Sequence, residues 1–203
     1  MFLQVLQGTV GDARALREQL DSWVQDHAAH AEGWLGTTAG ITEDGEFIAV
    51  VRFESTEAAR RNSDRDEQGK WWSETERHFE GPVQFHDYPN AAEFLDGGSD
   101  DAGFVQVIQG RSSDVERLIT LERDLEQSLR ELRPDLIGGT YGWDDQGHMT
   151  QTAYFTSEAE ARKGEQGEFA APENVQRANE QYRQLVTDMR YFDLRNPWLR
   201  SAQ

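Results

Sequence analysis

Short apolar runs alternate with longer amphipathic segments along the first part of the chain. The apolar runs cover residues 2–7, 34–41, 46–54 and 82–88, and each has the length and composition of a β-strand. Two helical regions separate them, one beginning at the expected N-cap Asp12 and one running from Ser55 to about Phe79. An Asp-Gly pair within residues 42–45 predicts a tight hairpin between the second and third strands. The pattern predicts the element order βαββαβ.

The same pattern then returns, so that residue i aligns with residue i + 102. FLQVLQG at Phe2 reappears as FVQVIQG at Phe104, and the alignment runs without a gap to Arg61 and Lys163. A repeat of this period indicates a duplicated domain. In the second copy, Ser113 opens the first helix with an expected capping box. Strands are predicted at residues 104–109, 136–143, 148–155 and 189–194.

The repeat divides the chain into two modules with connecting segments. We predict a first module over residues 1–88 and a second over residues 104–194. Residues 89–103, which are rich in Gly and Asp, are expected to form a linker, and residues 195–203 a C-terminal tail.

The predicted fold class is α+β, with two tandem ferredoxin-like modules. The order βαββαβ gives a four-stranded antiparallel sheet with both helices on one face. Because the strands are apolar on both sides, the free face of each sheet must be buried. We therefore expect the modules to pack sheet to sheet as an intramolecular dimeric α+β barrel. The sequence leaves open whether whole chains form a further homodimer.

The two modules, starting at FLQVLQG and FVQVIQG, resemble a fused member of the dimeric α+β barrel superfamily that includes antibiotic-biosynthesis monooxygenase-like proteins. The resemblance covers both repeats and implies cofactor-independent oxygenation of polycyclic aromatics, haem degradation or isomerisation as candidate activities. Haem-degrading members use an Asn on the first strand, where this chain has Gln7 and Gln109. A haem-degrading role is therefore not expected.

Charge and composition exclude several classes of partner. The formal net charge of −18 argues against binding of nucleic acid and of anionic membrane surfaces. No cysteine is present, so thiolate catalysis and cysteine metal sites are excluded. No dinucleotide, phosphate-loop or paired metal motif occurs, and we expect neither a cofactor nor a metal. The start of the sequence lacks a signal-peptide pattern, which predicts a cytoplasmic location.

The third strands of the two modules differ in chemistry. The first module presents Ile48, Val50 and Arg52 on one strand face, where the second presents two threonines and a tyrosine. Hydroxyl groups beside aromatic rings are typical of a small-molecule pocket. The alternative is a partly solvated sheet face, where Thr and Tyr are simply good strand residues. The candidate ligand-binding residues are Thr150, Thr152 and Tyr154, with Tyr141, Trp143 and His148 beside them.

Four further residues are candidates. Gln106 lies mid-strand, where a buried amide must find a hydrogen-bond partner, in the protein or in a ligand. The consecutive Trp71 and Trp72 are expected to divide between packing on the sheet and covering a pocket mouth. His78 follows on the same helical region and could share that cavity. Structural packing is the alternative for all four.

Two functions remain open from the sequence. The first is a small-molecule-binding protein, including a cofactor-independent oxygenase or related enzyme acting on a hydrophobic, aromatic or polyketide-like compound. The second is a non-catalytic structural or stress-associated α+β barrel protein whose pockets are filled by side chains. The sequence does not decide whether the protein is an enzyme.

Overall fold

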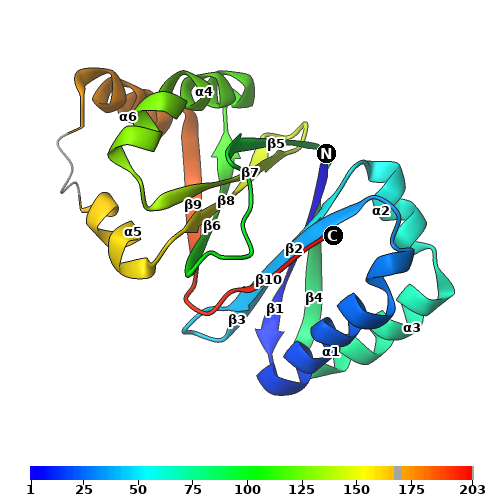
Figure 1. Ribbon diagram of the computed structural model, residues 1–203. Coiled ribbons are helices and arrows are strands. Elements are labelled where there is room, and N and C mark those ends of the chain that lie inside the picture. The colour runs from blue at the N-terminus through cyan, green and yellow to red at the C-terminus, as the bar shows by residue number, and fades with distance from the viewer. Residues whose placement is uncertain (167–170, 203) are drawn as a thin grey trace. The chain divides into compact units, whose positions relative to one another are not determined.

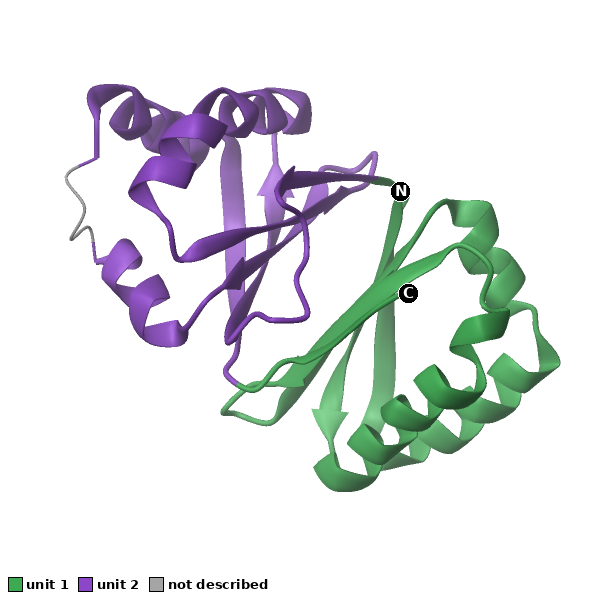
Figure 2. Cartoon of the chain, viewed as in Figure 1, with its two compact units in different colours: residues 1–90, 196–203 green, residues 91–195 purple. Residues whose placement is uncertain are grey.

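The computed structural model describes residues 1–166 and 171–202. The chain forms two compact units, one of residues 1–90 and 196–203 and the other of residues 91–195 (Figure 2). We call them module 1 and module 2. The fold class is α+β, as predicted.

Module 1 contains a five-stranded sheet in the order β10-β2-β3-β1-β4, and every strand pair in it is antiparallel. Its strands are β1 (Phe2–Val10), β2 (Trp34–Ile41), β3 (Glu46–Phe53), β4 (Phe79–Tyr88) and β10 (Trp198–Ser201). The predicted hairpin joins β2 to β3, and Gly45 takes the left-handed conformation at φ 84° that glycine accepts without strain.

Three helices cover one face of this sheet (Figure 1). They are α1 (Ala13–Asp26), α2 (Thr56–Ser63) and α3 (Asp66–Thr75), with short 3-10 turns η1 (Ala28–His30) and η2 (Glu76–His78). Asp12 caps α1 as predicted, because its carboxylate accepts the backbone N–H of Ala15 at 3.0 Å. The core on this face includes Phe2, Trp23, Trp34 and Phe53.

Module 2 repeats the arrangement with the sheet order β5-β7-β8-β6-β9. Its strands are β5 (Asn90–Leu95), β6 (Phe104–Ser112), β7 (Leu136–Trp143), β8 (His148–Phe155) and β9 (Val186–Leu194), and its helices are α4 (Val115–Leu132), α5 (Glu158–Glu165) and α6 (Glu173–Leu185). Leu121 and Leu125 of α4 pack against Val175 and Ala178 of α6. The cap of α4 is Asp114, one residue after the predicted Ser113, because the helix begins at Val115.

Each sheet has one strand more than the four predicted. The predicted linker contains β5, which joins the sheet of module 2, and the predicted tail contains β10, which joins the sheet of module 1. Both strands pair with an edge that would otherwise leave backbone N–H and C=O groups without partners. In the described part of the chain, no helix is long and apolar enough to cross a membrane.

Candidate functional site

Module 1 encloses a cavity of 430 Å³ between its sheet and its helices. Buried side chains such as Leu16 and Phe47 form its inner end, whereas Phe85 and Arg200 are exposed at its rim. The cavity falls within the range of about 300–1,000 Å³ that is usual for small-molecule pockets. It is therefore large enough for an aromatic ligand of several rings.

Two alanines on the sheet leave room for this cavity because their side chains are small. Ala39 of β2 and Ala49 of β3 line the cavity floor and are buried. The aligned residues of module 2 are Tyr141 and Gln151, which fill the equivalent place. Gln151 Nε2 donates to the Tyr141 hydroxyl oxygen at 3.1 Å. The corresponding hollow in module 2 measures only 60 Å³, so the two copies have diverged at this site.

A polar network occupies a second part of the equivalent region in module 2. Gln106 Nε2 donates to Asp193 Oδ1 at 2.9 Å and to Glu165 Oε1 at 3.1 Å. Arg162 also binds both carboxylates and places its guanidinium 5.2 Å from the centre of the Phe104 ring. Hydrogen bonds within module 2 thus satisfy the side-chain amide of Gln106. In module 1 the aligned Gln4 lines the cavity and donates to Asp87.

Aromatic rings form the walls of the module 1 cavity. Trp23 of α1 lies with its ring centre 6.3 Å from that of Trp71 on α3, and Trp72 lies 5.0 Å from Phe85 in an edge-to-face arrangement. Trp198 of β10 closes another wall. Both consecutive tryptophans therefore line the cavity. Flat, apolar walls of this kind bind planar rings.

Hydrogen bonds fix the indole rings in place. Trp23 Nε1 donates to Gln68 Oε1 at 2.7 Å, and Trp71 Nε1 donates to the backbone carbonyl of Gln19 at 3.1 Å. A buried indole N–H without a partner would be costly, so these bonds favour the observed ring orientations. The cavity walls are accordingly preorganised.

Charged groups lie at one end of the cavity. Arg200 Nη2 and Asp21 Oδ1 are 2.7 Å apart, and both residues line the cavity. Thr37 lies beside them and accepts a hydrogen bond from Trp34 Nε1 at 3.1 Å. Among the described lining residues, Asp21 is the one carboxylate, and none is histidine or lysine. The arrangement is suited to binding an apolar molecule with one polar end.

The other predicted residues lie elsewhere. His78 is in η2 and is not part of the cavity lining. On β8, Met149, Ala153 and Phe155 pack with the helix-covered core, so the alternating positions face away from the helices. Those positions hold His148, Thr150, Thr152 and Tyr154, whereas Tyr141 and Trp143 lie on the helix-covered face. Module 2 does not bring these six residues to one face.

Three threonine hydroxyls on that opposite face are buried without a hydrogen-bond partner among the described residues. They belong to Thr140, Thr150 and Thr152. Tyr154 is also buried, at 1% exposure. The four residues Thr140, Thr150, Thr152 and Tyr154 on the face predicted as a pocket wall are thus buried.

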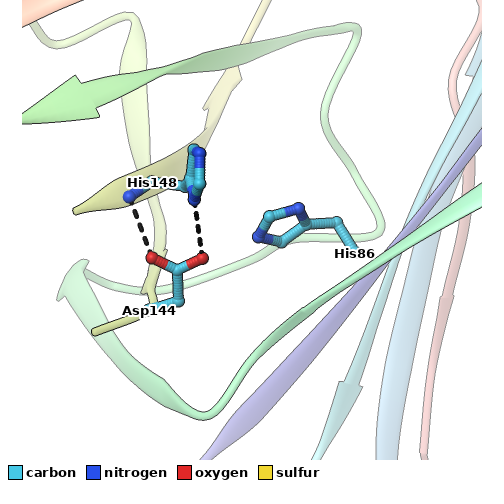
Figure 3. Close-up of side chains that lie close together, drawn as sticks. All are labelled: His86, Asp144 and His148. Atoms are coloured by element: carbon cyan, nitrogen blue, oxygen red, sulfur yellow. Dashed lines mark hydrogen bonds and ion pairs between the residues drawn. The ribbon is translucent and has the colours of Figure 1, made fainter. Parts of the chain in front are cut away.

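His148 has a structural partner in its own hairpin (Figure 3). Its Nδ1 lies 2.8 Å from Asp144 Oδ2, and Asp144 Oδ1 accepts the backbone N–H groups of Gln146 and His148, each at 2.9 Å. Such bonds from an aspartate to the following backbone are typical of a tight turn. Asp144 therefore closes the hairpin and orients the imidazole.

A carboxyl group takes the place of a cavity-lining leucine in module 2. Glu122 on α4 aligns with Leu20, which lines the module 1 cavity, and lines the small hollow of module 2. Burial raises the pKa of Glu122 to about 8. Burial also raises the pKa of the neighbouring Tyr182. This helix position is thus apolar in one module and titratable in the other.

The signal for the cavity was present in the internal alignment. Ala39 opposite Tyr141 and Ala49 opposite Gln151 show where one copy lost volume. The sequence does not indicate which face of β3 meets the helices, because β3 is largely apolar on both faces. The contribution of β10 carries no comparable signal.

No protein-family model matches the sequence, and no curated protein matches it. Solved structures do match the fold. A candidate monooxygenase from Lactobacillus acidophilus NCFM is 10% identical with a TM-score of 0.75, over 98% of this chain and 95% of that one. One from Fusobacterium nucleatum is 9% identical with a TM-score of 0.73, over 98% and 94%.

An anthrone oxidase-like protein is also similar, at 11% identity and a TM-score of 0.67 over 99% of this chain and 93% of that one. At these identities the likeness is one of fold alone. The predicted resemblance to monooxygenase-like ferredoxin-fold proteins is confirmed at that level.

Proposed function

We propose that module 1 binds a hydrophobic aromatic or polyketide-like molecule in its 430 Å³ cavity, and that the protein is a cofactor-independent oxygenase or a related enzyme. The observation that carries the proposal is the aromatic-walled cavity in one copy of a duplicated module whose counterpart is filled. An unfilled cavity costs stability, because its lining forgoes packing contacts. A binding role accounts for its retention.

The reaction class is suggested by the fold neighbours, which include candidate monooxygenases and an anthrone oxidase-like protein. Oxidation of anthrone by O₂ places one oxygen atom in a second ketone and releases the other as water. The substrate supplies all four electrons, so no external reductant is needed. In this cavity the rings of Trp23, Trp71 and Trp72 would hold the planar substrate, and Asp21 is the one lining carboxylate that could accept a proton.

The binding proposal is tested by transplanting the residues that fill module 2. The double variant Ala39→Tyr/Ala49→Gln should abolish binding of 9-anthracenecarboxamide, measured by quenching of tryptophan fluorescence, because two large side chains enter the cavity. The reciprocal variant Tyr141→Ala/Gln151→Ala is the matched control and should leave the module 1 site unchanged. Equal binding by wild type and the filled variant would rule out this cavity as the site.

The oxygenase proposal is tested separately by O₂ uptake with anthrone and no added cofactor. The expected result is uptake of one O₂ per anthrone above the uncatalysed rate, lost in the Ala39→Tyr/Ala49→Gln variant. Binding without turnover would favour the alternative, a non-catalytic protein. The filled module 2 is the observation that supports that alternative.

A further inference from the structure

We propose that the ligand of module 1 is an aromatic anion, a carboxylate or a phenolate, whose charged group binds Arg200 at the β10 end of the cavity. This inference rests on the proposed function and specifies its ligand class. It follows from the placement of charge, because the charged residues among the described cavity lining are Asp21 and Arg200, which lie side by side.

The guanidinium of Arg200 is positioned by the protein. Its Nη2 lies 2.7 Å from Asp21 Oδ1, and its Nη1 donates to the backbone carbonyl of Leu199 at 2.8 Å. A guanidinium has five N–H donors. Two contacts fix its orientation, and further N–H groups can meet an acceptor entering from the cavity. Arg200 thus has the geometry of an anion-binding group.

A second arginine adds positive charge at the same end. Arg17 lies 3.9 Å from Asp21 Oδ2, and its guanidinium is 5.3 Å from the centre of the Trp198 ring, which lines the cavity. Two arginines around one aspartate leave a surplus of positive charge. The chain as a whole carries −18, so most of its surface repels anions. This end of the cavity is a local exception.

Thr37 supplies a neutral donor beside Arg200. The two residues are paired across β2 and β10, and both line the cavity. Because the Thr37 hydroxyl oxygen accepts the Trp34 indole N–H, its own hydrogen is free to point toward a ligand. An oxyanion placed here would receive hydrogen bonds from two side chains.

Module 2 lacks these features, which supports a ligand-specific origin for them. The residue aligned with Arg17 is Ile119, and the residue aligned with Thr37 is Gly139. The small module 2 hollow is lined by three glutamates, Glu93, Glu122 and Glu126, and by one arginine, Arg123. The surplus of positive charge therefore accompanies the open cavity, whereas glutamates outnumber arginine around the filled one.

The test compares two probes of the same shape. Wild-type protein should bind 9-anthracenecarboxylate about five- to tenfold more tightly than neutral 9-anthracenecarboxamide at low salt, as expected for a charge-assisted contact that stays partly exposed. The preference should shrink with added salt. Arg200→Gln should remove the preference by weakening carboxylate binding, and Arg200→Lys should retain most of the preference.

Two further variants separate a ligand contact from a structural role. Asp21→Asn should strengthen carboxylate binding about threefold, because a competing anion is removed, without strengthening amide binding. Arg14→Gln is the matched control, since Arg14 pairs with Glu18 on the same helix and lies outside the cavity lining. Equal binding of both probes by wild type, or an unchanged preference in Arg200→Gln, would overturn the inference and leave the proposed function standing. Failure of both probes to bind would overturn both.

Discussion

Replacing Glu122 with leucine should make the stability of module 2 less dependent on pH. Leucine is the residue that module 1 places at the aligned position, Leu20, so its shape suits this helix and sheet. Burial raises the pKa of Glu122 from the usual 4.5 to about 8. The folded protein therefore binds a proton between these values that the unfolded chain does not bind.

The sign follows from that difference in proton uptake. The contribution of Glu122 to folding stability is most favourable below about pH 4.5, and it is lost as pH rises through about 8, because the carboxyl must ionise inside the folded module. A full shift from 4.5 to about 8 corresponds to about 5 kcal/mol as an upper limit. The side chain is only half-buried, so it can turn toward water on ionising. We therefore expect ionisation of Glu122 to lower the free energy of unfolding by about 2 kcal/mol between pH 5 and pH 9.

The measurement is urea unfolding of wild type and Glu122→Leu at pH 5, 7 and 9. The stability of the variant relative to wild type should rise by about 2 kcal/mol across this range. Glu131→Leu is the control, because Glu131 is exposed on the same helix and the substitution is identical. Its pH profile should run parallel to that of wild type. If the Glu122→Leu profile is also parallel, the carboxyl is ionised in the folded state and the reasoning fails.

Two further substitutions test the two modules separately. Trp198→Ala removes a cavity wall of module 1 and should weaken 9-anthracenecarboxamide binding at least fivefold, as measured by fluorescence titration. Because the Trp198 ring is partly exposed, the loss of stability should be limited to about 1–2 kcal/mol, as measured by thermal unfolding. Arg162→Met removes the cation from Glu165 and Asp193, whereas Glu158 keeps Arg195, and it should destabilise module 2 by about 1–3 kcal/mol in urea unfolding. Probe binding should be unchanged, and a binding defect would contradict the placement of the site in module 1.

Much of the fold could be predicted because local and repeated signals agree. The Asp-Gly turn before Glu46 and the cap at Asp12 support the βαββαβ order in module 1, and the alignment of Phe2 with Phe104 extends that order to module 2. The fifth strands could not be predicted in this way. Strand β10 has four residues, and β5 lies in a segment rich in turn-forming residues, so neither has a pattern long enough to identify its partner.

The site was predictable only in part. The sequence indicates Trp71 and Trp72 as candidates because two consecutive tryptophans cannot both point inward on one helix face. The difference between modules that creates the cavity is the smaller side-chain volume at Ala39 and Ala49, and an alanine in a strand does not by itself indicate a pocket. Arg200 reaches the cavity through long-range strand pairing that local periodicity does not encode.

The place of β10 in the sheet of module 1 also sets an order of events during synthesis. Domains generally fold from the N-terminus as the chain emerges from the ribosome. Here β1 to β4 emerge early, but Trp198 and Arg200 follow only after all of module 2 has been translated. Until then, the β2 edge of the nascent first module has no partner strand, and the cavity lacks the wall that Trp198 forms. A ligand meets the finished site only once translation of the second module is complete.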